Sequence, residues 1–188
     1  MNADAIWGKK MAMVVIDPQR KFSLPAEDWN GRMEPAVEAI NRYAEIFRRH
    51  GAPVIFVAFN GPSHCGYTGD DGDDWLPGIE QKQSDIIVRK NHMNCFKETD
   101  LEGILSRNGI DCVLFAGMLT EFCVITTYFG ASERGMVPYL GKGATIPYNR
   151  EGTAAAEIVC STADAEVLER FLSGEQPEPE WPYEESHS

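Results

Sequence analysis

Short runs of apolar residues recur along the chain and are separated by segments of mixed or polar character. Four runs are clear and two are weaker, and they occupy residues 11–16, 53–59, 84–89, 112–116, 137–140 and 158–160. Apolar runs of this length are typical of strands that are buried on both faces of a sheet. The first run ends at Asp17-Pro18, where proline cannot continue the hydrogen-bond ladder of a strand. The pattern therefore predicts about six strands.

Helical periodicity appears between these runs. In residues 34–50, Val37, Ile40, Ala44 and Phe47 recur at steps of three and four residues, which gives a helix one apolar face. A proline suits the first turn of this helix, and a glycine follows its last turn as a stop signal. This segment is predicted to cover one face of the sheet.

Three further helices are expected. One begins at the sequence Thr99-Asp100-Leu101-Glu102, where Thr99 would cap the helix and Glu102 would reach back, and it ends near Asn108. The others span residues 121–134 and 165–172. Strands that alternate with helices form βαβ units, so the predicted fold class is α/β, a doubly wound, mostly parallel sheet with helices on both faces.

Two segments have no regular period. Residues 60–83 are rich in Gly, Asp and Pro, and a stretch of that length without regular structure is usually a functional loop. Residues 174–188 are acidic and proline-rich, and we expect them to be loosely ordered or docked on a partner through Trp181 and Tyr183. The expected organisation is a single domain over residues 1–173, followed by this tail.

Composition narrows the class of protein. The 188 residues are 43% hydrophobic and 24% charged, which suits one globular domain. With 17 basic and 29 acidic residues the formal net charge is -12, which disfavours binding to nucleic acids and to anionic membranes. The first ten residues are polar and include Asp4, unlike a signal peptide. The apolar runs are too short to span a bilayer. We therefore expect a cytoplasmic protein. Five cysteines, an odd number, leave at least one thiol free.

Candidate chemistry lies where the predicted strands end. In a parallel α/β sheet, functional residues lie just beyond the carboxyl ends of the strands. Those positions hold Asp17, Lys90 and Cys123. Thr120 is a plausible N-cap, so Cys123 would lie in the first turn of a helix, where a thiol loses its proton more easily and helix amides can bind an oxyanion.

Each of these residues also has an ordinary structural interpretation. Most cysteines are structural, a lysine at a strand end is usually solvated, and an aspartate there can simply cap a turn. Together, however, they bring a nucleophile, a cation and a proton carrier to one edge of one sheet.

Three segments, in this order, resemble the isochorismatase-like cysteine hydrolases. VVIDPQRKF (residues 14–22) resembles the first strand of that family, with its aspartate and its Asp-x-Gln pattern. VRKNHMNCFKETDLEGILSRNGID (residues 88–111) resembles the lysine segment. LFAGMLTEFCVITT (residues 114–127) resembles the nucleophile signature Gly-x-x-Thr-[Asp/Glu]-x-Cys-Val. The resemblance extends over roughly residues 11–172.

The resemblance implies specific roles. Asp17, Lys90 and Cys123 would form a catalytic triad. The Met118–Leu119 peptide bond would be cis, and the backbone amides of Leu119 and Cys123 would form the oxyanion hole.

Two differences within the family bear on the chemistry. The nicotinamidase branch of the family carries an Asp-x-His…His metal site. The corresponding segment here, FNGPSHCGYTGDD (residues 59–71), has Asn60 where the acidic ligand would begin, and it lacks the His-x-x-x-His spacing. We therefore expect no metal and no cofactor. Isochorismatases that cleave a vinyl ether typically lack the cysteine, so Cys123 favours hydrolysis of a C–N bond. Residues 141–153 depart from the family pattern.

The expected function is cysteine-dependent hydrolysis of a small amide, carbamoyl or ureido compound through a thioester. The alternatives are hydrolysis of an isochorismate-like vinyl ether and a non-catalytic binding relative. Phe22 and Trp75 lie in loops beside the predicted site, where an aromatic side chain can either line a pocket or simply pack within the loop. The expected substrate-binding residues are Gln19, Phe22, Asn60 and Trp75. The expected partners are the small-molecule substrate and further copies of the chain, as a dimer or tetramer.

Overall fold

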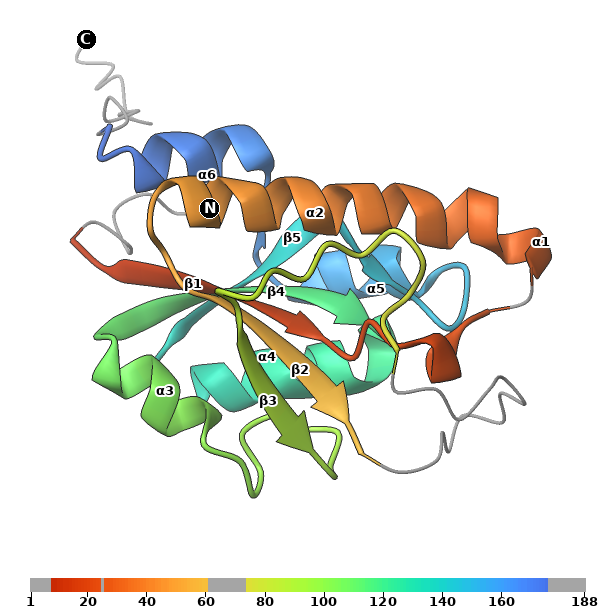
Figure 1. The fold of residues 1–188 in the computed structure, drawn as a ribbon, viewed down its shortest axis with the longest axis horizontal. Helices are drawn as coiled ribbons and strands as arrows, with labels where there is room; N and C mark the ends of the chain where they lie inside the picture. The colour runs from red at the N-terminus through yellow and green to blue at the C-terminus, as the bar shows by residue number, and fades with distance from the viewer. Residues whose placement is uncertain (1–7, 25, 61–73, 176–188) are drawn as a thin grey trace, which may run out of the picture.

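A computed structural model describes residues 8–24, 26–60 and 74–175 (Figure 1). Its six strands form one sheet in the order β3-β2-β1-β4-β5-β6, and all neighbouring strands are parallel. The strands are β1 (Lys10–Ile16), β2 (Val54–Phe59), β3 (Ile86–Lys90), β4 (Ile110–Met118), β5 (Val137–Ile146) and β6 (Thr162–Ala163). The prediction of a doubly wound α/β sheet of about six strands is confirmed.

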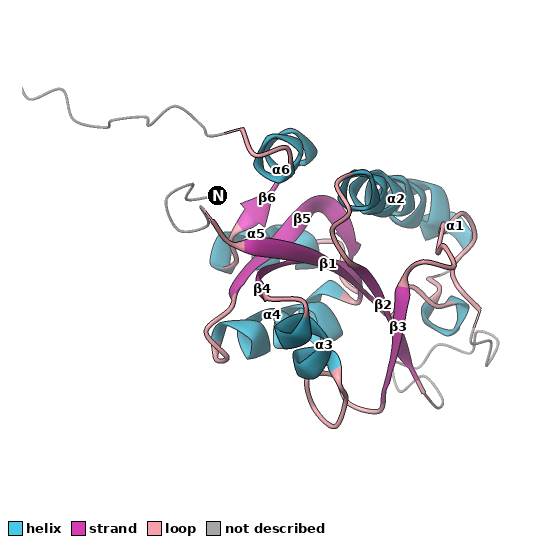
Figure 2. Cartoon of the chain, turned by 60° about the vertical axis from the view of Figure 1, so that its left-hand side comes forward, coloured by secondary structure: helices cyan, strands magenta, loops and turns pink. Residues whose placement is uncertain are grey.

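Helices cover both faces of this sheet (Figure 2). Short α1 (Ala26–Asp28) leads through a π-helical turn, Trp29–Met33, into α2 (Glu34–Arg49). The remaining helices are α3 (Leu101–Arg107), α4 (Ile125–Ser132), α5 (Gly152–Val159) and α6 (Ala165–Leu172). Helices α2 and α6 lie on one face, and α3, α4 and α5 lie on the other.

The central strand β1 shows how alternation along a strand builds the two layers. Met11, Met13 and Val15 point to one side and cluster with Phe47 of α2 and Leu168 of α6. The alternate residues of β1 join the opposite core, with side chains from α3 and α4. All residues of β1 except the first are buried, as expected for a central strand of a covered parallel sheet.

The predicted strand at residues 158–160 is wrong. Ile158 and Val159 end helix α5, Cys160 is the C-cap of this helix, and the sixth strand is the two-residue β6. The preceding Ala154-Ala155-Ala156 segment favours a helix that continues through the short apolar run. Ile158 is 84% exposed, which is incompatible with a buried strand.

The other helix and strand boundaries differ less. Strand β5 continues six residues past the predicted end. After an irregularity in which β5 carries extra residues opposite β4, Thr145 and Ile146 pair with Gly117 and Met118. Helix α3 has Asp100 as its N-cap, so the predicted capping box is not formed. The Thr99 hydroxyl accepts the Leu101 N–H at 3.2 Å, and the Glu102 carboxylate binds an arginine at the end of the neighbouring helix.

Parts of two expected segments lie outside the described residues. These are residues 61–73 of the expected loop and residues 176–188 of the tail, including Trp181 and Tyr183. Residues 74–83 contain neither helix nor strand apart from a single bridge between Trp75 and Gln19. Within the described residues, no helix has both the length and the apolar character needed to cross a bilayer.

Candidate active site

Three strands bring the candidate residues to one edge of the sheet. Asp17 directly follows β1, Lys90 is the last residue of β3, and Cys123 lies in a π-helical turn, Thr120–Val124, that follows β4. Because the strands are parallel, their carboxyl ends meet at this edge. Asp17 has φ of +47°, a left-handed conformation that aspartate tolerates better than most residues.

Asp17 and Lys90 form a fully buried ion pair. Lys90 Nζ lies 2.6 Å from Asp17 Oδ2, and the two side chains are 0% and 1% exposed. The ammonium also donates a hydrogen bond to the Met93 carbonyl at 3.1 Å and lies 5.5 Å from the centre of the Phe59 ring. Cys123 lines the same small cavity as Asp17, and the two groups influence each other's pKa, so carboxylate, ammonium and thiol lie in one buried site.

Burial dominates the proton affinities in this group. It raises the pKa of the Asp17 carboxyl above its usual range, although Lys90 and the Cys123 thiol oppose the shift. Burial and the Asp17 carboxylate also raise the pKa of the Cys123 thiol, and the opposing effect of Lys90 is smaller. The expectation that this thiol ionises readily is therefore wrong for the free protein.

Lys90 behaves differently. Burial alone would lower the pKa of its ammonium, but Cys95, Asp17 and Cys123 together raise it. The raised pKa values of Lys90 and Cys123 both favour the protonated forms, a charged ammonium and a neutral thiol. Next to them is a carboxylate that binds a proton more readily than an ordinary aspartate.

The chain bends sharply between β4 and the turn Thr120–Val124, which we call the nucleophile turn because it carries Cys123. Gly117 has φ of +106°, and a side chain there would collide with the backbone of Ile16 in the neighbouring strand. The Met118–Leu119 peptide bond that follows is cis. Leu119 is the N-cap of the turn that carries Cys123. This path directs the chain from the buried end of β4 to the edge of the site.

A small cavity of about 100 Å³ opens beside Cys123. Its lining among the described residues is apolar except for the site groups, and consists of Asp17, Phe22, Phe59, Met93, Met118, Leu119, Phe122 and Cys123. A cavity of this size and character suits a small uncharged group next to the thiol.

Of the expected substrate-binding residues, Phe22 is one of these lining residues. Gln19 instead holds the end of β2: its Oε1 accepts the Phe59 N–H at 2.7 Å, and its Nε2 donates to the Phe59 carbonyl at 3.3 Å. Asn60 accepts a hydrogen bond from an arginine of β3 at 3.4 Å, and Trp75 packs against a phenylalanine of β2. Substrate contacts for Gln19, Asn60 and Trp75 stay predictions.

Several residues of the site are not apparent from sequence patterns. Lys21 is buried, donates to the Phe59 carbonyl at 2.9 Å, and lowers the pKa of Asp17 against the effect of burial. Phe59, Met93 and Phe122 are cavity walls. Phe59 ends a predicted strand, and Phe122 precedes the cysteine, so nearness to the predicted strand ends is the signal that could have identified them.

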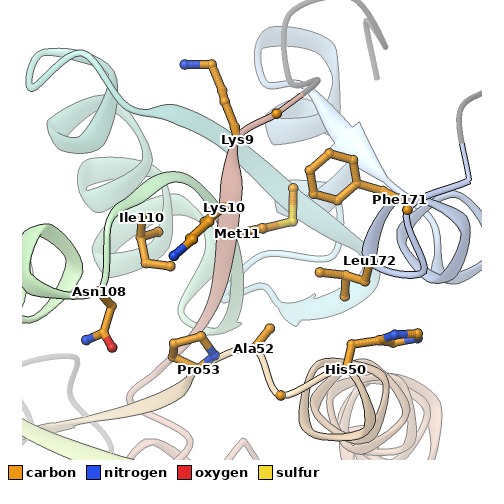
Figure 3. Close-up of a pocket in the computed structure, with 13 residues that line it drawn as sticks. Lys9, Lys10, Met11, His50, Ala52, Pro53, Asn108, Ile110, Phe171 and Leu172 are labelled. Carbon is orange, nitrogen blue, oxygen red and sulfur yellow. The ribbon is translucent and has the colours of Figure 1, made fainter.

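A larger hollow of about 590 Å³ lies at the opposite edge of the sheet (Figure 3). Lys10, Met11, Ile110 and Phe171 are among the residues around it, at the amino ends of the strands and the end of α6. It contains none of the three candidate residues. Among the described residues, no group of three or more His, Cys, Asp or Glu side chains is arranged to hold a metal ion.

The fold and the site together define an α/β enzyme with a cysteine at the carboxyl edge of a parallel sheet. The isochorismatase domain model matches residues 11–168, so the chain belongs to the isochorismatase family of hydrolases. Nicotinamidase 3 of Arabidopsis thaliana is 29% identical over 158 residues, which cover 76% of each chain.

Solved structures have the same fold. An isochorismatase-like hydrolase from Alkaliphilus metalliredigens matches with a TM-score of 0.70 at 21% identity, over 88% of this chain and 98% of that one. N-carbamoylsarcosine amidase from Thermoplasma acidophilum matches with a TM-score of 0.69 at 24% identity, over 84% and 97% of the two chains.

Proposed function

We propose that this hydrolase cleaves the C–N bond of a small amide, carbamoyl or ureido compound through a thioester on Cys123. The observation that carries the proposal is the buried site in which Asp17 pairs with the Lys90 ammonium and lines the same small cavity as Cys123. The names of two similar proteins, a nicotinamidase and an N-carbamoylsarcosine amidase, agree with chemistry at a C–N bond.

The first half of the reaction forms the thioester. Asp17 takes the thiol proton as Cys123 sulfur attacks the substrate carbonyl, and the negative charge moves to the carbonyl oxygen. The N–H groups of Leu119 and Cys123, at the start of a helical turn, would hold this oxygen. Asp17 then gives its proton to the leaving nitrogen, the C–N bond breaks, and ammonia or an amine departs.

The second half hydrolyses the thioester. Asp17 removes a proton from water, the resulting hydroxide adds to the carbonyl, and the C–S bond breaks. The thiolate recovers the proton from Asp17, and a carboxylic or carbamic acid is released. Lys90 stays charged throughout, which stabilises Asp17 whenever it is ionised.

The raised pKa values fit this cycle. A thiol that stays neutral at rest must transfer its proton during attack, and the carboxyl beside it has a raised pKa, which makes it a better base. The apolar cavity walls favour a small, uncharged acyl or carbamoyl group over a charged one.

The test begins with a screen for ammonia release from small primary amides and ureido compounds. On a substrate so found, Cys123→Ala should lower kcat/KM by about a thousandfold or more, because the covalent intermediate cannot form. Cys112→Ala is the matched control: Cys112 is buried within β4, away from the cavity, and this variant should keep the parent activity. Acid-quenched parent enzyme should carry an acyl adduct on Cys123, seen by mass spectrometry.

A Cys123→Ala enzyme within about tenfold of the parent, a loss of only ~1.4 kcal/mol, would exclude the covalent mechanism. Asp17→Asn should disable the enzyme in either chemistry, because both need a proton carrier. Activity that survives in Cys123→Ala and is lost in Asp17→Asn would point instead to protonation of a vinyl ether.

A further inference from the structure

Glu121 holds the loop between β5 and α5 against the turn that carries Cys123. Its Oε2 accepts the Tyr148 N–H at 2.8 Å, and its Oε1 accepts the Asn149 N–H at 2.7 Å. One carboxylate that accepts two successive backbone N–H groups fixes both the position and the orientation of the loop. Glu121 lies two residues before Cys123, in the same π-helical turn.

The loop is built to receive this carboxylate. Gly152 lies so close to Glu121 that a side chain at position 152 would collide with the carboxylate. The Gly152 N–H donates to the Asn149 carbonyl at 3.0 Å, and Arg32 donates to the Tyr148 carbonyl at 3.1 Å. The carboxylate, the glycine and the arginine thus fix this loop from three sides.

The loop reaches the cavity through two aromatic rings. The ring of Tyr148 packs edge-on against that of Phe122, with the ring centres 6.0 Å apart. Phe122 lines the cavity together with Cys123. Phe122 is 37% exposed and Tyr148 is 40% exposed, so each ring is partly open to solvent and the contact between them contributes to where each ring lies. The position of the Phe122 wall therefore depends on where the loop holds Tyr148.

We propose that Glu121 is a positioning residue that sets the width of the cavity beside Cys123. It acts through the Tyr148–Asn149 backbone, which places Tyr148 against Phe122, and the resulting wall selects small acyl groups over bulky ones. The assignment rests on the proposed function only in taking this cavity as the place where the acyl group binds.

The experiment reads the width of the cavity without requiring any hydrolysis. Cys123 is alkylated with iodoacetamide or with the bulkier 2-iodo-N-phenylacetamide; in each case an S–C bond forms, iodide leaves and the thiol proton passes to solvent. Rates at Cys123 are followed by mass spectrometry. In Glu121→Gln the amide group presents an NH₂ to one of the two N–H donors, and the loop loses its bidentate acceptor.

The expected result is a change in the ratio of the two alkylation rates. In Glu121→Gln, the alkylation rate of the bulkier reagent divided by that of the smaller one should rise by about two- to tenfold. This factor corresponds to the free energy that an aromatic pair contributes. Tyr148→Ala leaves Glu121 in place but removes the supporting ring, so it should shift the ratio in the same direction. Because Tyr148 is exposed, this variant also tests the proposal should Glu121→Gln fail to fold.

Two controls separate positioning from plain destabilisation. Glu133→Gln removes an exposed carboxylate at the end of α4 and should leave the ratio unchanged. Gly152→Ala crowds the Glu121 carboxylate, so it should shift the ratio too, and adding Glu121→Gln to it should have little further effect. A lower melting temperature with an unchanged ratio in Glu121→Gln and Tyr148→Ala would overturn the proposal.

The two proposals fail separately. If no amide or ureido compound is hydrolysed, the proposed function fails while the alkylation ratio still reports on Glu121. If hydrolysis is found, Glu121→Gln should improve kcat/KM for a bulky amide relative to a small one by a similar factor. An unchanged preference in an active enzyme would contradict the positioning role alone.

Discussion

At the scale of single residues, the site is shaped by the exclusion of water from three reactive groups. Asp17 and Lys90 are fully buried, and Cys123 is only partly exposed. An isolated buried charge is costly, so the pair depends on its short contact and on the Met93 carbonyl as a further acceptor. The same burial keeps the thiol neutral, which makes Asp17 the group that controls nucleophile formation.

This control can be measured as a change in thiol reactivity with pH. The Asp17 carboxylate raises the pKa of the Cys123 thiol and Lys90 lowers it, so Asp17→Asn should lower this pKa and Lys90→Met should raise it. Because only the thiolate reacts, iodoacetamide labelling of Cys123 should reach half its maximal rate at lower pH in Asp17→Asn. At pH 7.5 this variant should label several-fold faster than the parent.

The matched control is Asp111→Asn, which removes an exposed carboxylate on β4 and should leave the labelling profile unchanged. Cys123 should also label before Cys95, Cys112 and Cys160, which are buried. A labelling profile that moves to higher pH in Asp17→Asn would show that the carboxylate does not hold the proton on the thiol.

The sequence located these residues but not their proton affinities. Asp17, Lys90 and Cys123 could be found because each follows an apolar run, and parallel strands end at one edge. Burial of the thiol could not be found in this way. It depends on walls such as Phe59 and Met93, which come from separate segments and meet only after folding.

At the scale of elements, the link between β4 and the nucleophile turn places Cys123 against the other two groups. Gly117 combines a left-handed φ with close contact to the backbone of β1, so both its conformation and its lack of a side chain are needed. Gly117→Ala should therefore lower the free energy of unfolding by about 3 kcal/mol or more, measured by urea denaturation.

Gly135→Ala gives the matched comparison. Gly135 has φ of +75°, but a side chain there would meet no atom within 4 Å, so only the backbone conformation should oppose the change. That cost is about 1–2 kcal/mol. Equal losses in the two variants would mean that the contact between Gly117 and β1 contributes nothing to stability.

The elements also show where local sequence patterns stop being informative. Long runs such as β1 and β2 could be predicted because six or more apolar residues in a row have few other uses. The apolar residues at 158–160 were too few to distinguish a strand from a helix end, and α5 forms because alanines precede them. Only pairing with β5 identifies Thr162–Ala163 as the last strand.

At the scale of the whole molecule, charge is the feature that the fold leaves unbalanced. The chain carries 29 acidic and 17 basic residues. Exposed ion pairs such as Arg107–Asp100 and Lys82–Glu80 contribute little, because solvent and salt screen them. Whether copies of this acidic chain associate into a dimer or tetramer stays a prediction.

Excess negative charge should make the fold more stable in moderate salt. Raising NaCl from 10 to 200 mM screens the repulsion among the acidic residues, and the melting temperature should rise by about 2–4 °C, which corresponds to ~1 kcal/mol for a chain of this size. The rise in melting temperature should level off near 0.2 M, unlike a general salt effect, which keeps growing.

A charge-reversal variant tests the same cause. Glu38→Lys changes the net charge from -12 to -10 at an exposed position of α2, so it should raise the melting temperature at 10 mM NaCl and make the salt effect smaller. A melting temperature that falls with added salt would show instead that surface ion pairs outweigh the net repulsion.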